Sequence, residues 1–144
     1  MLELDSVRDH KALGLSDEQA LAMYRTMLLA RRLDDRMWAL NRQGRVPFVV
    51  SVSGHEATQV GAASALDPAI DWSLPYYRDI AFSLGLGVTP EEIFLGVFSK
   101  AADPASAGRQ MPNLSLIHIS EPTRHTTQTR IPENGEKKGG GGGG

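Results

Sequence analysis

The segment Asp17–Arg42 constrains the fold more than any other part of the sequence, because it contains neither glycine nor proline. Apolar residues recur along it at steps of three and four: Ala20, Met23, Met27, Ala30, Leu33, Met37 and Leu40. This spacing predicts one long amphipathic helix, about 39 Å in length at ~1.5 Å per residue. Ser16 and Gln19 have the spacing of a capping box at its start, and Gly44 is a typical residue for its C-terminal stop.

The apolar stripe of this helix is wide, because Leu21, Tyr24 and Leu28 extend it. The other faces of this helix carry charged residues: Arg31, Arg32, Asp34, Asp35 and Arg36. A stripe of this width needs a large partner surface, supplied by the rest of the domain or by another subunit. The methionines within the stripe are therefore interpreted as packing residues.

The rest of the chain up to residue 112 also reads as mainly α-helical. Residues 46–52 (VPFVVSV) predict a short extended segment. Ser53 and Glu56 have capping-box spacing, which predicts a helix over residues 54–66. A short helix is expected over residues 78–84, and Thr89-Pro90 opens another that runs to about residue 100. Residues 101–112 read as a loop. The second of these helices carries small residues that allow another backbone to approach closely: Gly61, Ala62, Ala63 and Ala65.

The sequence changes character after residue 113. No aromatic residue follows Phe98, and the chain ends in a run of glycines from 139 to 144. One natural back-translation of residues 114–124 (LSLIHISEPTR) resembles a transposase adapter used to prepare sequencing libraries. We therefore expect a lead-in over residues 1–15, one folded region over 16–113, and a non-native, disordered tail over 114–144. A natural disordered tail is the alternative, and under either interpretation His118 and His125 are not metal ligands.

Composition excludes several classes of function. The formal net charge of −2 does not suit binding to a nucleic-acid backbone. The absence of cysteine excludes disulfides and thiolate metal sites. No apolar run approaches the ~18–20 residues of a membrane span, and the acidic start differs from a secretory or transit peptide. We expect a soluble, cytoplasmic protein with neither nucleic acid nor membrane as a partner.

The pair Tyr77-Arg78 is the first candidate for chemistry. A guanidinium is planar, permanently charged and forked, so it suits bidentate contact with a phosphate, and a neighbouring tyrosine hydroxyl adds a donor. Where a loop meets the start of a helix, such a pair can hold a diphosphate. The alternative is a surface arginine that pairs with Asp79 or another acid.

Two further positions carry weaker signals. His55-Glu56 lies at a predicted helix start, where it suits acid–base chemistry or cofactor contact. The capping box explains Glu56 without catalysis, and we prefer that interpretation. Arg109, in the loop over residues 108–112, is expected either to bind an anion or to brace the loop.

Read in order, the motifs resemble a known family. The matching strings are LSDEQALAMYRTMLLARRLDDRMWALNRQGRVPF, SGHEATQVGAASALD, LPYYRD, TPEEIF and AGRQMP. Over residues 13–112 the chain is similar to the N-terminal part of the alpha subunit of the branched-chain 2-oxo acid dehydrogenase decarboxylating component. The resemblance implies an α/β thiamine-diphosphate-binding fold, an α2β2 heterotetramer with a beta subunit, and acyl transfer to a lipoyl-bearing dihydrolipoyl acyltransferase core. It also implies that Tyr77 and Arg78 contact the cofactor diphosphate.

The resemblance sets limits as well. Related pyruvate- and acetoin-type alpha subunits usually carry a histidine where this chain has Val49-Val50-Ser51-Val52, so the apolar stretch favours a branched aliphatic substrate over pyruvate or acetoin. The family segment that binds Mg²⁺ is not found in this sequence. We therefore expect this chain alone to be inactive, with no catalytic residue and no metal ligand assigned. A non-catalytic helical interaction module is the alternative from another class.

Overall fold

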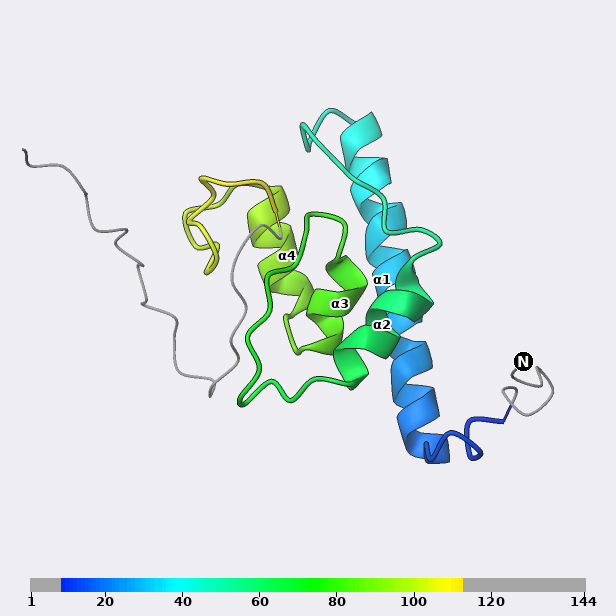
Figure 1. Ribbon diagram of the computed structural model, residues 1–144. Helices are drawn as coiled ribbons and strands as arrows, with labels where there is room; N and C mark the ends of the chain where they lie inside the picture. Colours follow the sequence, from blue (N-terminus) through cyan, green and yellow to red (C-terminus); the bar gives the residue numbers. More distant parts are fainter. Residues whose placement is uncertain (1–8, 113–144) are drawn as a thin grey trace, which may run out of the picture.

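The computed structural model describes residues 9–112, which are built from four helices and the turns between them (Figure 1). The helices are α1 (Asp17–Arg42), α2 (Glu56–Ser64), α3 (Ile80–Gly85) and α4 (Pro90–Val97). The predicted mainly helical character is confirmed, and residues 9–112 contain no strand of the α/β fold that the resemblance implies. The predicted tail over 114–144, and the first part of the predicted lead-in, lie outside the described residues.

The predicted ends of α1 are confirmed. The Ser16 hydroxyl accepts a hydrogen bond from the Gln19 N–H at 3.1 Å, and the Gln19 side chain accepts one from the Ser16 N–H at 2.8 Å. At the other end Gly44 adopts φ +68°, and its N–H donates to the Asn41 carbonyl at 2.8 Å. The Arg45 N–H donates to the Leu40 carbonyl at 3.0 Å, which completes a Schellman motif.

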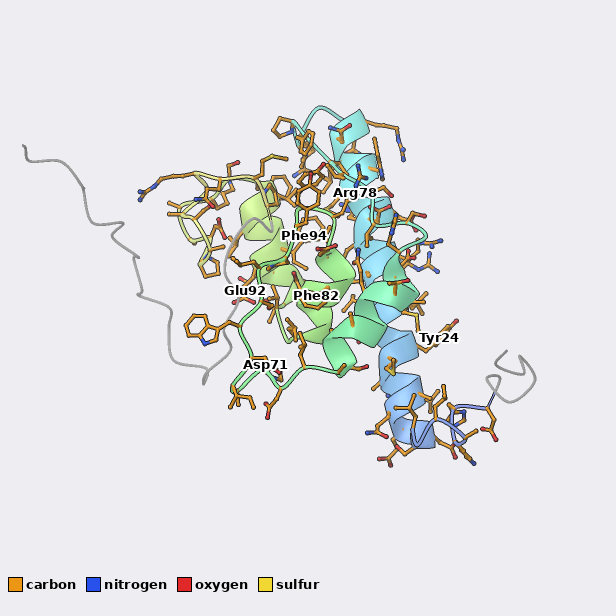
Figure 2. All side chains as sticks on the ribbon, in the orientation of Figure 1. Tyr24, Asp71, Arg78, Phe82, Glu92 and Phe94 are labelled. Carbon is orange, nitrogen blue, oxygen red and sulfur yellow. The ribbon has the colours of Figure 1, made fainter. Side chains whose placement is uncertain are left out.

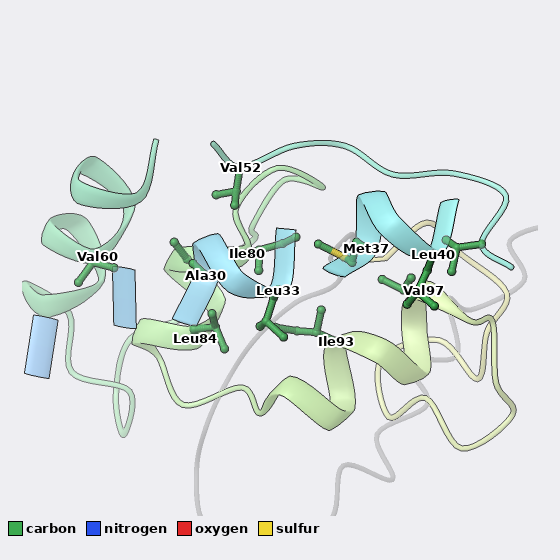
Figure 3. Close-up of a cluster of buried hydrophobic side chains, with 12 residues drawn as sticks. Ala30, Leu33, Met37, Leu40, Val52, Val60, Ile80, Leu84, Ile93 and Val97 are labelled. Atoms are coloured by element: carbon green, nitrogen blue, oxygen red, sulfur yellow. The ribbon is translucent and has the colours of Figure 1, made fainter. Parts of the chain in front are cut away.

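The hydrophobic core lies against the C-terminal half of α1. The buried residues of the α1 stripe are Ala30, Leu33, Met37 and Leu40. Leu33 points toward Ile93 of α4, and Leu40 lies beside Val97 (Figure 3). In the view of Figure 1, α3 lies between α1 and α4. The predicted packing role of the methionines is confirmed, because Met37 is buried and Met23 and Met27 pack against the edge of the core.

The N-terminal half of α1 has little cover from the described residues. Leu21, Tyr24 and Leu28, which were predicted to widen the stripe, are 52%, 60% and 44% exposed. Every buried residue of α1 lies at or after Ala30. The apolar stripe of α1 is therefore buried only in its C-terminal half, where α2, α3 and α4 pack against it.

The start of α2 was predicted two residues too early. The helix begins at Glu56 rather than Gly54, and its first residue is preceded by His55 with no side-chain cap. Ser53 is not the cap, because a turn closed by the His55 N–H and the Val52 carbonyl at 3.0 Å intervenes. The Glu56 carboxylate instead reaches Arg31 of α1. The predicted Ser53–Glu56 capping box is wrong for this reason.

The third and fourth helices also differ from their predicted limits. Helix α3 begins at Ile80 rather than at residue 78. Helix α4 has the predicted start, with the Thr89 hydroxyl accepting the Glu92 N–H at 3.2 Å and Glu92 accepting the Thr89 N–H at 2.8 Å. It ends at Val97 rather than near residue 100, because Ser99 adopts φ +50° and closes the last turn.

Helices α2 and α3 approach closely through small residues. A Cβ placed on Gly85 would lie 2.6 Å from the Cβ of Ala63, so the two backbones are as near as a glycine allows. The prediction of close approach is confirmed at Ala63 alone. Ala62 and Ala65 are exposed, and Gly61 faces open space.

The predicted extended segment over residues 46–52 forms no strand. Val46 and Val52 are buried, and residues 48–52 carry no regular secondary structure. The Val52 N–H donates to the Asp34 carboxylate of α1 at 3.1 Å, and the Asn41 amide donates to the Val46 carbonyl at 2.8 Å. Side chains of α1 thus take the bonds that a neighbouring strand would supply.

Candidate functional site

Tyr77 and Arg78 lie in the turn that leads into α3. In the view of Figure 2, Arg78 lies toward the end of α1 away from Tyr24. Tyr77 is half-buried and Arg78 is exposed. The rings of Tyr76 and Tyr77 are 3.8 Å apart between centroids, and the Arg78 guanidinium carbon lies 5.6 Å from the Tyr77 ring centre. The Tyr77 hydroxyl raises the pKa of Tyr76, so the Tyr76 phenol stays protonated at neutral pH. The turn presents a cation over an aromatic face.

The Arg78 guanidinium forms no ion pair with any residue in 9–112. Its Nη1 donates to the Ser51 carbonyl at 3.4 Å, a long contact. The alternative that it pairs with Asp79 does not hold, because the Asp79 carboxylate accepts the Tyr76 N–H at 2.9 Å and the Gln59 amide at 3.2 Å. Most of the five N–H donors of the guanidinium therefore remain available to an anion.

One buried side chain of α2 holds the backbone of this turn. The Gln59 Nε2 donates to the Arg78 carbonyl at 3.1 Å as well as to Asp79. Its Oε1 accepts the Ala81 N–H at 3.1 Å. Gln59 is 8% exposed, so its amide group is largely shielded from solvent while its bonds join the turn to α2.

A second buried group, Asp34 of α1, holds the Ser51 loop that Arg78 touches. Its carboxylate accepts the Ser51 hydroxyl at 2.7 Å and the Val52 N–H at 3.1 Å. Asp34 is 3% exposed, which corrects the prediction that it faces away from the core. It lies four residues after Ala30 and three before Met37, so its place in the apolar stripe is the signal that would have identified it.

Tyr77 also borders a small apolar pocket. The pocket is lined by Met37, Phe48, Val49, Val50, Tyr77, Ile80, Val97 and Pro112. No charged side chain is among these residues. The residues 49–50 that the sequence marked as apolar therefore line the same pocket as the candidate phosphate-contacting tyrosine.

The Glu56 carboxylate connects the start of α2 to α1. It accepts the Arg31 Nε at 2.5 Å and the Gly54 N–H at 2.9 Å, and it is buried. The hydrogen bond from Arg31 holds the pKa of Glu56 below its ordinary value, so the carboxylate is ionised at neutral pH. An ionised, paired carboxylate is poorly suited to donate a proton. His55 beside it is exposed.

The loop over residues 101–112 is braced by Asp103 rather than by Arg109. The buried Asp103 carboxylate accepts the N–H groups of Ala105, Ser106 and Gly108 at 3.0, 3.2 and 3.2 Å, and the Ser106 hydroxyl at 2.7 Å. Arg109 is exposed, and among residues 9–112 its side chain has no hydrogen-bond or ion-pair partner. Asp103 was not predicted from the sequence, although Asp-Pro with a serine two residues later is a typical turn signal.

The described residues show neither a cluster of metal ligands nor a membrane-spanning helix. Residues 9–112 contain no group of three or more histidine, aspartate or glutamate side chains placed to hold a metal ion. None of the helices between residues 9 and 112 has the length and hydropathy to cross a membrane.

Comparison with known proteins places this chain in a family. The model of the family described as Dehydrogenase E1 component matches residues 24–132, a range that includes Tyr77 and Arg78. This range extends past residue 113, and the non-native origin of the tail stays a prediction. No solved structure matches the chain.

Three relatives illustrate the similarity. The 2-oxoisovalerate dehydrogenase subunit alpha of Bacillus subtilis (strain 168) is 58% identical over 107 residues, which make up 74% of this chain and 32% of that protein. The mitochondrial 2-oxoisovalerate dehydrogenase subunit alpha 1 of Arabidopsis thaliana is 35% identical over 133 residues, or 88% of this chain and 27% of that protein. The pyruvate dehydrogenase E1 component subunit alpha of Bacillus cereus is 40% identical over 98 residues, or 68% of this chain and 25% of that protein.

The chain thus spans about a third or less of the length of these relatives. The family match covers well over half of the chain, from residue 24 to residue 132. The chain belongs to the dehydrogenase E1 component family.

Proposed function

We propose that this chain is part of the alpha subunit of a branched-chain 2-oxo acid dehydrogenase, and that Tyr77 and Arg78 contact the diphosphate of thiamine diphosphate. The observation that carries the proposal is the Arg78 guanidinium, which is exposed, has no ion pair within residues 9–112, and lies over the ring of Tyr77 beside an apolar pocket. The similarity to the Bacillus subtilis 2-oxoisovalerate dehydrogenase subunit alpha supports it.

The donors at this turn fit a diphosphate. The forked guanidinium matches two phosphate oxygens and neutralises negative charge, and the phenolic hydroxyl of Tyr77 adds a directional donor. Thiamine diphosphate, when bound, supplies a nucleophilic carbon and an electron sink for decarboxylation of a 2-oxo acid. The Mg²⁺ implied by the resemblance would be held by residues other than 9–112. We therefore infer that the chain alone is inactive.

The apolar pocket supports a branched aliphatic substrate. Val49 and Val50 form part of its lining, and such a surface favours a branched side chain over the single methyl group of pyruvate. The pyruvate dehydrogenase alpha subunit of Bacillus cereus, 40% identical, keeps pyruvate as the second candidate substrate. The family match favours either enzyme over a non-catalytic helical module.

The proposal extends to partners and location. We infer an α2β2 assembly with a beta subunit, and transfer of the acyl group to lipoyl on a dihydrolipoyl acyltransferase core, in the cytoplasm. The exposed side chains of Leu21, Tyr24 and Leu28 on α1 provide an apolar surface of the kind such an assembly covers.

The test uses the complete alpha subunit assembled with its beta subunit. Arg78→Gln keeps the side chain polar but removes its charge, and we expect the dissociation constant of thiamine diphosphate to rise about 10- to 100-fold with Mg²⁺ present. Arg25→Gln is the matched control, since it removes an exposed arginine of α1 that belongs to no candidate site. Calorimetric titration measures both. Wild-type affinity in Arg78→Gln would show that the diphosphate assignment is wrong.

A further inference from the structure

We propose that Gln59 is a positioning residue, which sets the cofactor affinity of the site by fixing the backbone of Arg78. This proposal rests on the proposed contact between Arg78 and the diphosphate. Gln59 lies on the buried side of α2, and its side-chain amide bonds to two groups in the turn before α3 and to the Ala81 N–H in the first turn of α3. Gln59 itself carries neither a charge nor a reactive group, so its role is to position the backbone.

The Gln59 amide bonds to Arg78 itself and to two residues just after it. Nε2 of Gln59 donates to the Arg78 carbonyl at 3.1 Å and to Oδ1 of Asp79 at 3.2 Å, and Oε1 accepts the Ala81 N–H at 3.1 Å. The other carboxylate oxygen of Asp79 accepts the Tyr76 N–H at 2.9 Å. One buried amide therefore connects the backbone from Tyr76 to Ala81 to α2.

This arrangement needs an amide in particular. Nε2 faces two acceptors, a carbonyl and a carboxylate, while Oε1 faces one donor. A carboxylate has the same shape as the amide but no donor. In Gln59→Glu, an ionised oxygen would face the Arg78 carbonyl and the Asp79 carboxylate, and the turn would open without a change in side-chain volume.

The Arg78 side chain has little support of its own. Its polar contact in residues 9–112 is the 3.4 Å bond to the Ser51 carbonyl, and its other contact is the Tyr77 ring at 5.6 Å. The backbone of Arg78 therefore determines where this side chain begins, and few contacts within residues 9–112 hold the guanidinium beyond that point. If the backbone loosens, part of the diphosphate contact is lost although the charge of Arg78 remains.

The experiment is a double-substitution cycle in the complete alpha subunit assembled with its beta subunit. The dissociation constant of thiamine diphosphate is measured for the wild type, Gln59→Glu, Arg78→Gln and the double variant. We expect Gln59→Glu to weaken binding about fivefold or more, the equivalent of one net hydrogen bond. We expect the double variant to bind no more weakly than Arg78→Gln alone, because both substitutions remove the same contact.

Asn41→Asp is the matched control. The Asn41 amide donates to the Val46 carbonyl at 2.8 Å, so the substitution removes the same kind of bond between residues other than those that Gln59 joins. We expect Asn41→Asp to lower the melting temperature and to leave the dissociation constant unchanged. Gln59→Met, which is neutral and of similar length, replaces Gln59→Glu in the cycle if the buried charge prevents folding.

The outcomes separate the two proposals. If Arg78→Gln binds the cofactor like the wild type, the proposed function fails. If Arg78→Gln binds weakly while Gln59→Glu and Gln59→Met bind normally, the positioning role of Gln59 is overturned and the diphosphate contact stands. Multiplicative effects in the double variant, or an equal loss of affinity in Asn41→Asp, also overturn the positioning role.

Discussion

Asp34 accepts a hydrogen bond from the Ser51 hydroxyl at 2.7 Å, which ties the middle of α1 to the loop before α2. The same carboxylate accepts the buried Val52 N–H at 3.1 Å. Because the Ser51 carbonyl is the backbone group that Arg78 touches, this bond connects the longest helix to the candidate site.

We predict that Asp34→Ala destabilises the chain by about 2–4 kcal/mol, since it leaves the buried Val52 N–H without an acceptor. Asp34→Asn keeps one acceptor oxygen and should lose about 1–2 kcal/mol. Asp35→Ala, one residue along on the exposed side of α1, is the control and should change stability by less than about 0.5 kcal/mol. Urea unfolding followed by circular dichroism measures all three. Equal stability of the two alanine variants would contradict the role of Asp34.

The ion pair between Arg31 and Glu56 predicts that the stability of the folded chain changes with pH in the acid range. The hydrogen bond from Arg31 holds the pKa of Glu56 below its ordinary value in the folded chain. A lowered pKa contributes stability that is fully present above the ordinary carboxyl pKa of about 4.3 and is lost as the pH falls through the folded value. Glu56→Gln should therefore be less stable than the wild type at neutral pH, and the difference should shrink in acid.

Asp17→Asn serves as the control for Glu56→Gln. His10 lowers the pKa of Asp17 too, but the Asp17 carboxylate is exposed, so the substitution should change the acid slope less than Glu56→Gln does. Urea unfolding of the three proteins across the acid range measures the slopes. A constant difference between wild type and Glu56→Gln at every pH would show that the pair is not the source.

The close approach of α2 and α3 predicts opposite effects for two glycine substitutions. In Gly85→Ala the new methyl group would lie 2.6 Å from the Ala63 Cβ, so the helices must separate, at a loss of about 1–3 kcal/mol. Gly61 lies in α2 with nothing within 4 Å of an added Cβ, and Gly61→Ala should gain about 0.5–1 kcal/mol from helix propensity. Adding Ala63→Gly to Gly85→Ala should recover part of the loss. Thermal unfolding of the four proteins tests the packing.

The elements that the sequence predicted well are those with local signals. The capping boxes at Ser16 and Thr89 lie within four residues of chain, and their hydrogen bonds form as expected. The start of α2 was missed because the Glu56 carboxylate accepts the Arg31 Nε, 25 residues away, and the Gly54 N–H, rather than the Ser53 N–H that the predicted capping box requires. Contacts at such separations depend on how the helices pack, and a single sequence does not encode them in a readable pattern.

The residues of the candidate site also differ in how readily the sequence reveals them. Tyr77 and Arg78 were proposed from residue type and from the resemblance, and their role stays a prediction. Gln59 and Asp34 were not proposed, because their partners lie 17 to 22 residues away. A polar residue inside an apolar stripe was a usable signal for Asp34, because a carboxylate is rarely buried without hydrogen-bond partners. Gln59 stands between buried Glu56 and Val60 on the same side of α2, which is visible only once the helix has been placed.

The apolar pocket predicts that substrate preference depends on Val50. Val50→Thr keeps the shape of the side chain but adds a hydroxyl to the pocket wall, which weakens contact with a branched aliphatic group and leaves pyruvate little affected. In the complete alpha subunit assembled with its beta subunit, the ratio of kcat/KM for 3-methyl-2-oxobutanoate over pyruvate should fall about 3- to 10-fold. Val88→Thr is the control, because Val88 packs against the core but does not line the pocket. If both variants keep the wild-type ratio, the pocket beside Tyr77 does not hold the substrate side chain, and the preference for branched acids must be set by other residues.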